Sequence, residues 1–287
     1  MKKFAVIGHP VAHSLSPVIH AANFSSLGYE GSYEKFDVTR ENLGAFIEKT
    51  KIEGYLGLNI TVPHKVAVLD FLDEVDESVR RYGSCNTIWF RNDGKSVGFN
   101  TDVNGFLETL EENNFDIRGK KVVCFGCGGA GQALALCSVY AGAKSVALGA
   151  LHQERAIYLA SNIKSRGFEA IALKSPMEDS LNARMLAWKE FALQADLIIN
   201  ATPIGLKEND EPLLSKEAFR IGQFVLDIIP TRSLPPTASQ SLGAGAKALG
   251  GVEFLVAQGA KSFEIWTGLK ADKKAMLRSV QEMKEED

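Results

Sequence analysis

Short apolar runs alternate with longer amphipathic segments along most of the chain. The short runs are rich in Val, Ile, Leu and Phe and end near Gly, Pro, Asn or Asp, which is typical of buried strands. The longer segments place apolar residues three or four positions apart, which is typical of helices. This alternation predicts an α/β fold. Strands are predicted at residues 4–8, 33–38, 55–60, 87–90, 96–99, 121–125, 145–148, 170–174, 196–201 and 223–227. A turn leading into a helix is predicted at 13–28, and helices are predicted at 39–50, 65–72, 102–113, 129–141, 154–165, 179–192, 257–267 and 271–284.

Three segments carry further local signals. Asn-Asp-Gly at residues 92–94 is typical of a hairpin turn between the two strands that flank it. The helix at 102–113 follows this hairpin and is predicted to link two domains. Residues 233–246 are rich in Pro, Ser, Gly and Ala, which predicts a loop.

Composition narrows the class of protein. The chain has 287 residues and a net charge of −3, so charge gives no reason to expect nucleic acid or an anionic membrane as a partner. The apolar run at 4–7 is too short for a signal peptide. The uncharged stretch at 122–143 is interrupted by glycines and divides into a strand, a turn and a helix, so it does not predict a membrane span. We predict a cytoplasmic protein with a small-molecule substrate.

A glycine-rich turn follows the strand at 121–125 and opens the next helix. It contains Gly126, Gly128, Gly129, Ala130 and Gly131. In this context a G-x-G-x-x-G spacing indicates dinucleotide binding, because glycines let the backbone approach a pyrophosphate at the helix N-terminus. The alternative is a plain strand-to-helix turn.

The strand after this turn lacks the acidic residue that usually holds an NAD ribose. It ends at Gly149 and is followed by Ala150-Leu151-His152. Arg155, a little further on, is a candidate for contact with a 2′-phosphate, with His152 assisting. The alternative for Arg155 is a solvated residue in the first turn of a helix.

The chain offers no metal spacing. Cys124 and Cys127 form a C-x-x-C pattern, but no further pair of ligands lies at a suitable distance in sequence, and the intervening Phe125-Gly126 belongs to the nucleotide turn. We expect a structural role for them rather than a redox role. His13, His20 and His64 are not spaced as ligands, so no metal is predicted.

Lys65 follows Pro63-His64 at the end of a predicted strand, where open α/β sheets place ligands. A lysine beside a carboxylate can relay a proton to or from an alcohol. A lone lysine is usually a solvated charge, but polar residues cluster beside apolar runs in this chain, which is costly without a functional reason. The cluster comprises Asn59, Thr61, Asn86, Asn100, Thr101 and Asp102.

Ser14 and Ser16 precede the first helix. Two hydroxyls and the amides of a helix N-terminus can hold a carboxylate. The alternative is ordinary capping, with Ser16 as the N-cap and Pro17 as the first helical residue.

Taken together, these motifs resemble the shikimate dehydrogenase family over nearly the full length of the chain. The matching segments are Ile7–Pro10, His13–Pro17, Asn59–Lys65, Cys85–Thr87, Asn100–Asp102, Gly126–Gly131, Asn200–Gly205 and Gln258–Ala260. The resemblance implies an N-terminal α/β substrate domain, residues 1–102 with 255–287 returning to it, and a Rossmann-type dinucleotide-binding domain, residues 103–254. It also implies a monomer or homodimer.

The activity implied by the resemblance is the NADP(H)-linked interconversion of 3-dehydroshikimate and shikimate in chorismate and aromatic amino-acid biosynthesis. The resemblance implies that Lys65 and Asp102 form an acid/base pair and that Ser14 and Ser16 bind the substrate carboxylate. It also implies that the ring hydroxyls are bound by Asn59, Thr61, Asn86 and Gln258, and that the nicotinamide is lined by Thr202 and Gly251.

Two departures from the family pattern bear on specificity. Ala150-Leu151-His152 stands where the family commonly has Asn-Arg-Thr, which leaves NAD as an alternative cofactor. After Asp227, Pro230 stands where the family usually carries a tyrosine that reaches the substrate carboxylate. One alternative is therefore a quinate/shikimate dehydrogenase that uses NAD. Another is a catalytically silent dinucleotide-binding sensor, against which the intact Lys65 and Asp102 argue.

Overall fold

The computed structural model describes residues 1–174, 181–207, 209–231 and 233–283. The chain divides into two compact units. Unit 1 comprises Met1–Glu108 and Phe254–Asp287, and unit 2 comprises Thr109–Glu253. The chain passes between the units inside two helices, α4 (Thr101–Glu112) and α9 (Gly251–Thr267).

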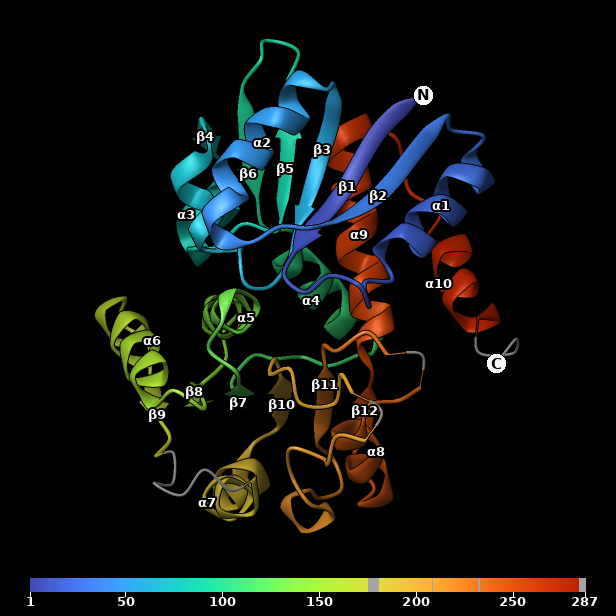
Figure 1. The fold of residues 1–287 in the computed structure, drawn as a ribbon. Coiled ribbons are helices and arrows are strands. Elements are labelled where there is room, and N and C mark those ends of the chain that lie inside the picture. The colour runs from blue at the N-terminus through green and yellow to red at the C-terminus, as the bar shows by residue number, and fades with distance from the viewer. Residues whose placement is uncertain (175–180, 208, 232, 284–287) are drawn as a thin grey trace. The chain divides into compact units, whose positions relative to one another are not determined.

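Unit 1 is built on a six-stranded sheet with the order β2-β1-β3-β5-β6-β4 (Figure 1). The pairs β1–β2, β1–β3 and β4–β6 are parallel, and the predicted hairpin β5–β6 is antiparallel. The strands are β1 (Lys2–Gly8), β2 (Gly31–Asp37), β3 (Tyr55–Ile60), β4 (Glu74–Val75), β5 (Thr87–Phe90) and β6 (Ser96–Phe99). The helices of this unit, besides α4 and α9, are α1 (Ser16–Leu27), α2 (Leu43–Ile52), α3 (Glu77–Tyr82) and α10 (Lys273–Glu282), with short 3-10 helices η1 (Arg40–Asn42) and η2 (Ala67–Phe71).

Apolar side chains cover both faces of this sheet. On one face, buried residues of β1 and β3 pack with Leu43 and Ile47 of α2. On the other face, the Phe4 ring stacks on Trp266 of α9 with centroids 4.9 Å apart. Gly57 of β3 lies under the same indole, so closely that a Cβ there would be 2.1 Å from Trp266 Nε1. The close approach of α9 explains why this strand position is a glycine.

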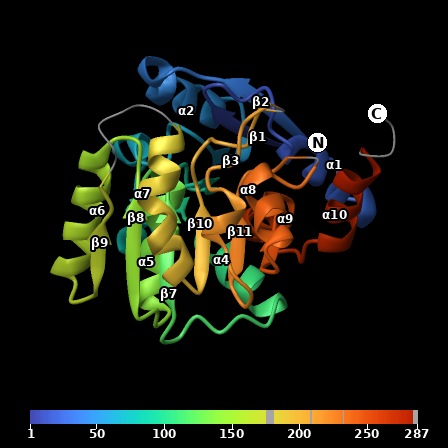
Figure 2. The same ribbon diagram turned by 90° about the horizontal axis from the view of Figure 1, so that it is seen from below.

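Unit 2 is an all-parallel sheet with the order β12-β11-β10-β7-β8-β9, which is the Rossmann order (Figure 1). Figure 2 shows its strands β9, β8, β7, β10 and β11 from another side. The strand order reverses between β7 and β10, and ligands of such sheets bind beyond the carboxyl ends of the strands at that reversal. The strands are β7 (Lys121–Phe125), β8 (Ser145–Gly149), β9 (Ala170–Ala172), β10 (Leu197–Asn200), β11 (Phe224–Asp227) and β12 (Lys247–Leu249). The helices are α5 (Gly129–Tyr140), α6 (Gln153–Ser165), α7 (Leu181–Gln194) and α8 (Pro236–Gly243), with the 3-10 helix η3 (Lys216–Ala218).

The predicted α/β fold is confirmed, and several element predictions are wrong. The predicted loop at 233–246 contains α8, and the helix predicted at 65–72 is only the 3-10 helix η2. The helix predicted from 257 begins at Gly251. The strands β4 and β12 and the helix α3 were not predicted. The predicted helical positions 179, 180 and 284 lie outside the described residues.

Candidate functional site

A buried lysine–aspartate pair lies in unit 1. Lys65 precedes η2 and Asp102 lies in the first turn of α4, and Lys65 Nζ donates to Asp102 Oδ2 at 2.6 Å. The two side chains are 12% and 2% exposed. Asn86 Nδ2 donates to the second carboxylate oxygen, Asp102 Oδ1, at 2.9 Å. The ammonium group is therefore held in place by a fixed carboxylate, and the lysine side chain as a whole keeps a small solvent-accessible surface.

A polar network surrounds this pair. Asn86 is its centre, because its Oδ1 accepts from the Thr101 amide at 2.7 Å and its Nδ2 also donates to Gln258 Oε1 at 3.0 Å. Asn59 Nδ2 donates to Ser262 Oγ at 2.9 Å. Buried polar groups are tolerated when they satisfy one another in this way. The structure thus brings together the predicted residues Asn59, Lys65, Asn86, Asp102 and Gln258.

The turn before α1 carries the two predicted serines. The helix begins at Ser16, and its N-cap is Leu15, which makes no side-chain capping bond. The prediction that Ser16 is the N-cap is therefore wrong by one residue: Ser16 is the first helical residue and Pro17 is the second. Ser14 Oγ accepts from the Ser16 amide at 3.3 Å. Both hydroxyls lie at the positive end of the helix dipole, where an anion is stabilised.

Thr61 follows β3 directly, and it is half-buried. Its amide donates to the Ile7 carbonyl at 2.9 Å, which places it beside the end of β1. The carboxyl end of β1 is occupied by Gly8, where a Cβ would be 2.4 Å from Thr61 Cγ2. The threonine thus lies beside the carboxyl ends of two parallel strands.

In unit 2, the glycine-rich turn has the geometry that its spacing predicts. Gly126 has φ +97°, a left-handed conformation that favours glycine. Gly128 is the N-cap of α5, and no atom lies within 4 Å of where its Cβ would be. Gly131 faces the turn so closely that a Cβ would be 1.8 Å from the Gly126 carbonyl oxygen. The open space at Gly128, together with Gly129 and Ala130 in the first turn of α5, fits a bound pyrophosphate.

A second loop at the carboxyl edge of this sheet is held by Asn200 and Asp227. These residues end the paired strands β10 and β11, and Asn200 Nδ2 donates to Asp227 Oδ2 at 2.9 Å. Thr202 Oγ1 donates to Asn200 Oδ1 at 2.7 Å, so the hydroxyl of this predicted nicotinamide neighbour also shapes its own loop. Gly251 packs on the chain after β11, because a Cβ there would be 2.4 Å from the Ile229 carbonyl carbon.

Arg155 lies in the first turn of α6 and is exposed, as is His152, the N-cap of that helix. The Arg155 amide donates to the His152 carbonyl at 3.0 Å. Leu151 is exposed and Ala150 is buried. Both side chains are apolar, so neither can contact a phosphate or a ribose hydroxyl through a charged or polar group. Arg155 therefore presents an exposed cation beside the end of β8, and this fits a 2′-phosphate without the second basic residue of the usual pattern.

Comparison with known proteins identifies the family. A family model described as the shikimate dehydrogenase substrate binding domain matches residues 6–88, and one described as the shikimate 5′-dehydrogenase C-terminal domain matches residues 251–281. The shikimate dehydrogenase (NADP(+)) of Moorella thermoacetica is 36% identical over 279 residues, covering 97% of this chain and 92% of that protein. The chain belongs to the shikimate dehydrogenase family.

Two further similarities extend over nearly the whole chain. The shikimate dehydrogenase (NADP(+)) of Methanopyrus kandleri is 37% identical over 281 residues, covering 96% of this chain and 94% of that protein. The crystal structure of shikimate 5-dehydrogenase from Thermus thermophilus, in complex with NADP(H) and shikimate, is 35% identical with a TM-score of 0.83, covering 98% of this chain and 99% of that one. This structural match supports the two-sheet architecture described above.

Sequence patterns missed two residues that touch the family's predicted substrate ligands. Tyr33 on β2 donates its hydroxyl proton to Asn59 Oδ1 at 2.7 Å, and Ser262 on α9 bonds Asn59 and Thr101. Neither belongs to a recognisable local motif. Both residues reach the site only because the fold brings distant segments together. The alternation of side chains along β2 does not indicate which of its polar residues faces the site.

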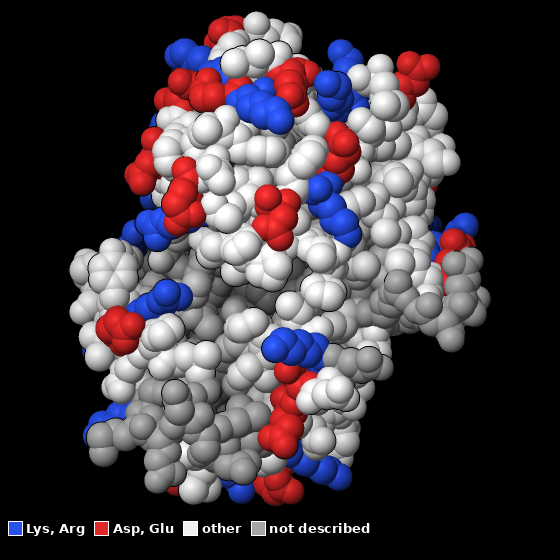
Figure 3. Space-filling model, in the orientation of Figure 1, with Lys and Arg blue, Asp and Glu red and all other residues white. Residues whose placement is uncertain are grey.

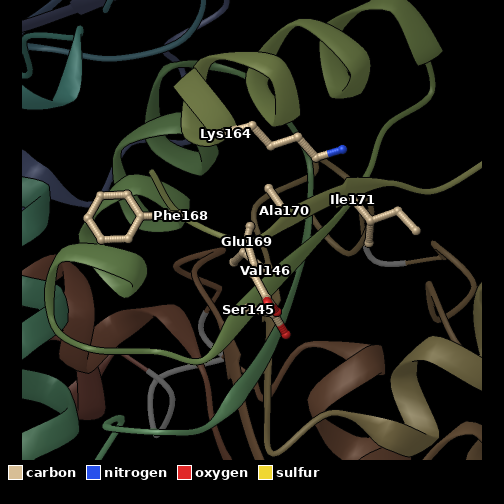
Figure 4. A pocket seen from close by; sticks show the side chains of 7 residues that line it. All are labelled: Ser145, Val146, Lys164, Phe168, Glu169, Ala170 and Ile171. Carbon is tan, nitrogen blue, oxygen red and sulfur yellow. The ribbon is translucent and has the colours of Figure 1, made fainter. Parts of the chain in front are cut away.

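Other surface features do not extend the site. A pocket of about 390 Å³ is lined by the start of β8, the residues around β9 and the end of α6, as Figure 4 shows. It lies at the amino end of β8, opposite to the edge where this fold binds ligands. On the face shown in Figure 3, acidic and basic side chains are interspersed. Within residues 1–174, 181–207, 209–231 and 233–283, no group of three or more His, Cys, Asp or Glu could hold a metal, and no helix is long and apolar enough to cross a membrane.

Asp227 gives a pH-dependent stability. Burial raises its pKa from 3.8 to about 7, against the opposing effect of the Asn200 hydrogen bond. Between pH 4 and 7 the unfolded chain loses this proton while the folded protein keeps it, so the group lowers stability progressively as pH rises, by roughly 4 kcal/mol in all above pH 7. Asp227→Asn removes this loss. We expect its apparent melting temperature, relative to wild type, to rise between pH 4.5 and 8.

The measurement is thermal unfolding of both proteins at the two pH values. Groups common to both proteins cancel in the difference, and so does any hydrogen bond that asparagine fails to make, because that loss is the same at both pH values. A difference in melting temperature that does not change with pH would show that Asp227 is ionised throughout.

Proposed function

We propose that the protein is a shikimate dehydrogenase that interconverts 3-dehydroshikimate and shikimate with NADP(H), in chorismate and aromatic amino-acid biosynthesis. The observation that carries the proposal is the 2.6 Å contact between Lys65 and Asp102, in a buried network of amides and hydroxyls. A protein that only senses dinucleotides has no need for an acid/base pair. In this proposal unit 1 binds the substrate and unit 2 binds the dinucleotide.

The reaction needs a proton to accompany hydride transfer. NADPH, when bound, supplies the hydride. In the reductive direction Lys65 donates a proton to the oxygen of the forming alcohol, and its positive charge stabilises the developing alkoxide before transfer. Asp102 orients the ammonium group, and Asn86 fixes Asp102 through the 2.9 Å bond to Oδ1. In the oxidative direction neutral Lys65 accepts the proton.

The remaining ligands position the substrate. Ser14 and Ser16, at the N-terminus of α1, would hold the carboxylate, while Asn59, Thr61, Asn86 and Gln258 would bind the ring hydroxyls. The glycine-rich turn would hold the pyrophosphate, and Thr202 and Gly251 would border the nicotinamide. No acidic residue at 150–152 is available to hold an NAD ribose, and Arg155 provides a cation for the 2′-phosphate of NADP.

The test is absorbance of the reduced nicotinamide with purified protein and four pairs: shikimate or quinate with NADP or NAD. We expect the highest kcat/KM for shikimate with NADP. Preference for quinate or NAD would instead mean that the sequence changes at Ala150–His152 and Pro230 have altered the specificity. Binding of a cofactor without turnover in any pair would favour a dinucleotide sensor.

Arg155 should determine the choice of cofactor. Loss of one charge-assisted contact costs about 1.5–3 kcal/mol, so Arg155→Ala should raise the KM for NADP at least tenfold. The KM for NAD should stay within twofold, because NAD has no 2′-phosphate. Arg166→Ala, at the end of the same helix, is the control. Equal changes for NADP and NAD would contradict a phosphate contact.

The cytoplasmic location and the monomeric or homodimeric assembly predicted from the sequence remain proposals. Cell fractionation tests the first, and sedimentation of the purified protein tests the second.

A further inference from the structure

Tyr33 on β2 contacts a residue of the proposed hydroxyl site. Its hydroxyl donates to Asn59 Oδ1 at 2.7 Å. Asn59 lies at the end of β3, so this hydrogen bond joins the side chains of two strands that β1 separates in the sheet.

The direction of the hydrogen bonds of Asn59 follows from the chemistry of their partners. Asn59 Nδ2 lies 3.2 Å from the Asn86 carbonyl oxygen, which can only accept. The amide nitrogen must therefore face Asn86, and the amide oxygen must face Tyr33. Tyr33 then gives its only proton to Asn59. The orientation of the Asn59 amide is therefore set by Asn86 on one side and Tyr33 on the other.

The imidazole ring of His20 packs against the Tyr33 ring and restricts its movement. The ring of His20 is fully buried and stacks on Tyr33 with centroids 4.3 Å apart and planes 6° apart. Neither ring nitrogen of His20 has a hydrogen-bond partner in the described part of the chain. Burial lowers the pKa of His20 to about 3, so it is neutral near pH 7. The Tyr33 ring therefore has little freedom to move its hydroxyl away from Asn59.

We infer that Tyr33 is a positioning residue for the substrate: its hydroxyl fixes the orientation of the Asn59 amide, one of the groups proposed to bind the ring hydroxyls. This inference rests on the proposed function. It assigns Tyr33 no proton transfer, since the single proton of its hydroxyl is committed to Asn59 rather than to Lys65 or Asp102. Its effect should therefore fall on substrate affinity rather than on the chemical step.

Tyr33→Phe tests this inference, because it keeps the stacked ring and removes only the hydroxyl. We expect the KM for shikimate to rise about tenfold, because the buried Asn59 amide oxygen loses its donor, while kcat stays within threefold and the KM for NADP within twofold. Tyr55→Phe is the matched control. Tyr55 lies in the same sheet and donates its hydroxyl to Glu34 Oε2 at 2.6 Å, within the core cluster that α2 covers. It should leave all three constants within twofold.

A double-mutant cycle with Asn59→Ala tests whether Tyr33 acts through Asn59. If it does, the effects of the two substitutions on log KM for shikimate will be less than additive. The inference is overturned if Tyr33→Phe leaves that KM within twofold of wild type, if Tyr55→Phe raises it equally, or if kcat falls while KM does not change. Absence of shikimate turnover by the wild-type protein would overturn the proposed function, and this inference with it, before any variant is compared.

Discussion

Lys65→Ala should lower kcat for shikimate about 1,000-fold, while the KM for shikimate stays within tenfold. Proton transfer by a positioned side chain contributes typically about 10²–10⁴ to the rate. The lysine is nearly buried, bonded to Asp102 at 2.6 Å, and acts on charge that develops only in the transition state, so its loss falls on kcat. Steady-state kinetics in both directions provide the measurement. A kcat within threefold of wild type would remove Lys65 from the chemistry.

The structure also suggests the controls. Lys51→Ala removes a lysine of the same unit that pairs with Asp73 at 3.2 Å outside the network, and it should be close to wild type. Because Lys65→Ala leaves Asp102 buried without its partner, Lys65→Arg is the second variant. Arginine keeps the positive charge beside Asp102 but does not release a proton near neutral pH. It should preserve the melting temperature and still lower kcat at least 100-fold.

Two glycines of the nucleotide turn should respond in different ways to alanine. At Gly131 a Cβ would be 1.8 Å from the Gly126 carbonyl oxygen, so the turn and the start of α5 must separate. Overpacking of this kind against backbone costs about 3 kcal/mol or more. Gly131→Ala should therefore lower the apparent melting temperature and weaken NADP binding more than 100-fold.

Gly128→Ala is the complementary variant. Gly128 has φ −80°, which alanine adopts readily, and no atom lies within 4 Å of its Cβ position. The free protein should keep its melting temperature, but the added methyl group would occupy space proposed for the pyrophosphate and raise the KM for NADP. Thermal unfolding with cofactor titration checks both variants. Wild-type affinity in Gly128→Ala would place the pyrophosphate elsewhere.

Most strands were predictable because they are short apolar runs with a simple sequence signal, as in β1, β3, β7, β8, β10 and β11. The signal fails where local composition and tertiary context disagree. Pro236–Gly243 is poor in large apolar residues, yet it forms α8 with Thr237 and Ala238 buried and the Leu213 amide bonded to Thr237 Oγ1 at 2.9 Å. The helix α9 begins at Gly251, where two consecutive glycines suggest a loop. Gly251 is a glycine because the chain after β11 packs so closely against it that a side chain would not fit.

The candidate site divides in the same manner. Lys65, Asp102 and Asn86 lie in ordered local motifs, so the sequence alone was enough to single them out. Tyr33 and Ser262 reach the network only through the fold, and Ser262 bonds Asn59 across 203 positions of sequence. Residue type and local spacing contain no record of such a contact, so it becomes visible only in the folded structure.

The returning segment of unit 1 has a consequence for synthesis on the ribosome. Gln258 and Ser262, which complete the polar network, come from α9, and Trp266 of the same helix covers Gly57 in the sheet. The ribosome therefore translates all of unit 2 before it makes the residues that complete unit 1. Domains generally fold in the order in which they are made. In this chain the sheet of unit 1 lacks α9 on one face until unit 2 has been made. Unit 2 is therefore free to fold first, and the surroundings of Lys65 and Asp102 are completed only once α9 has been translated.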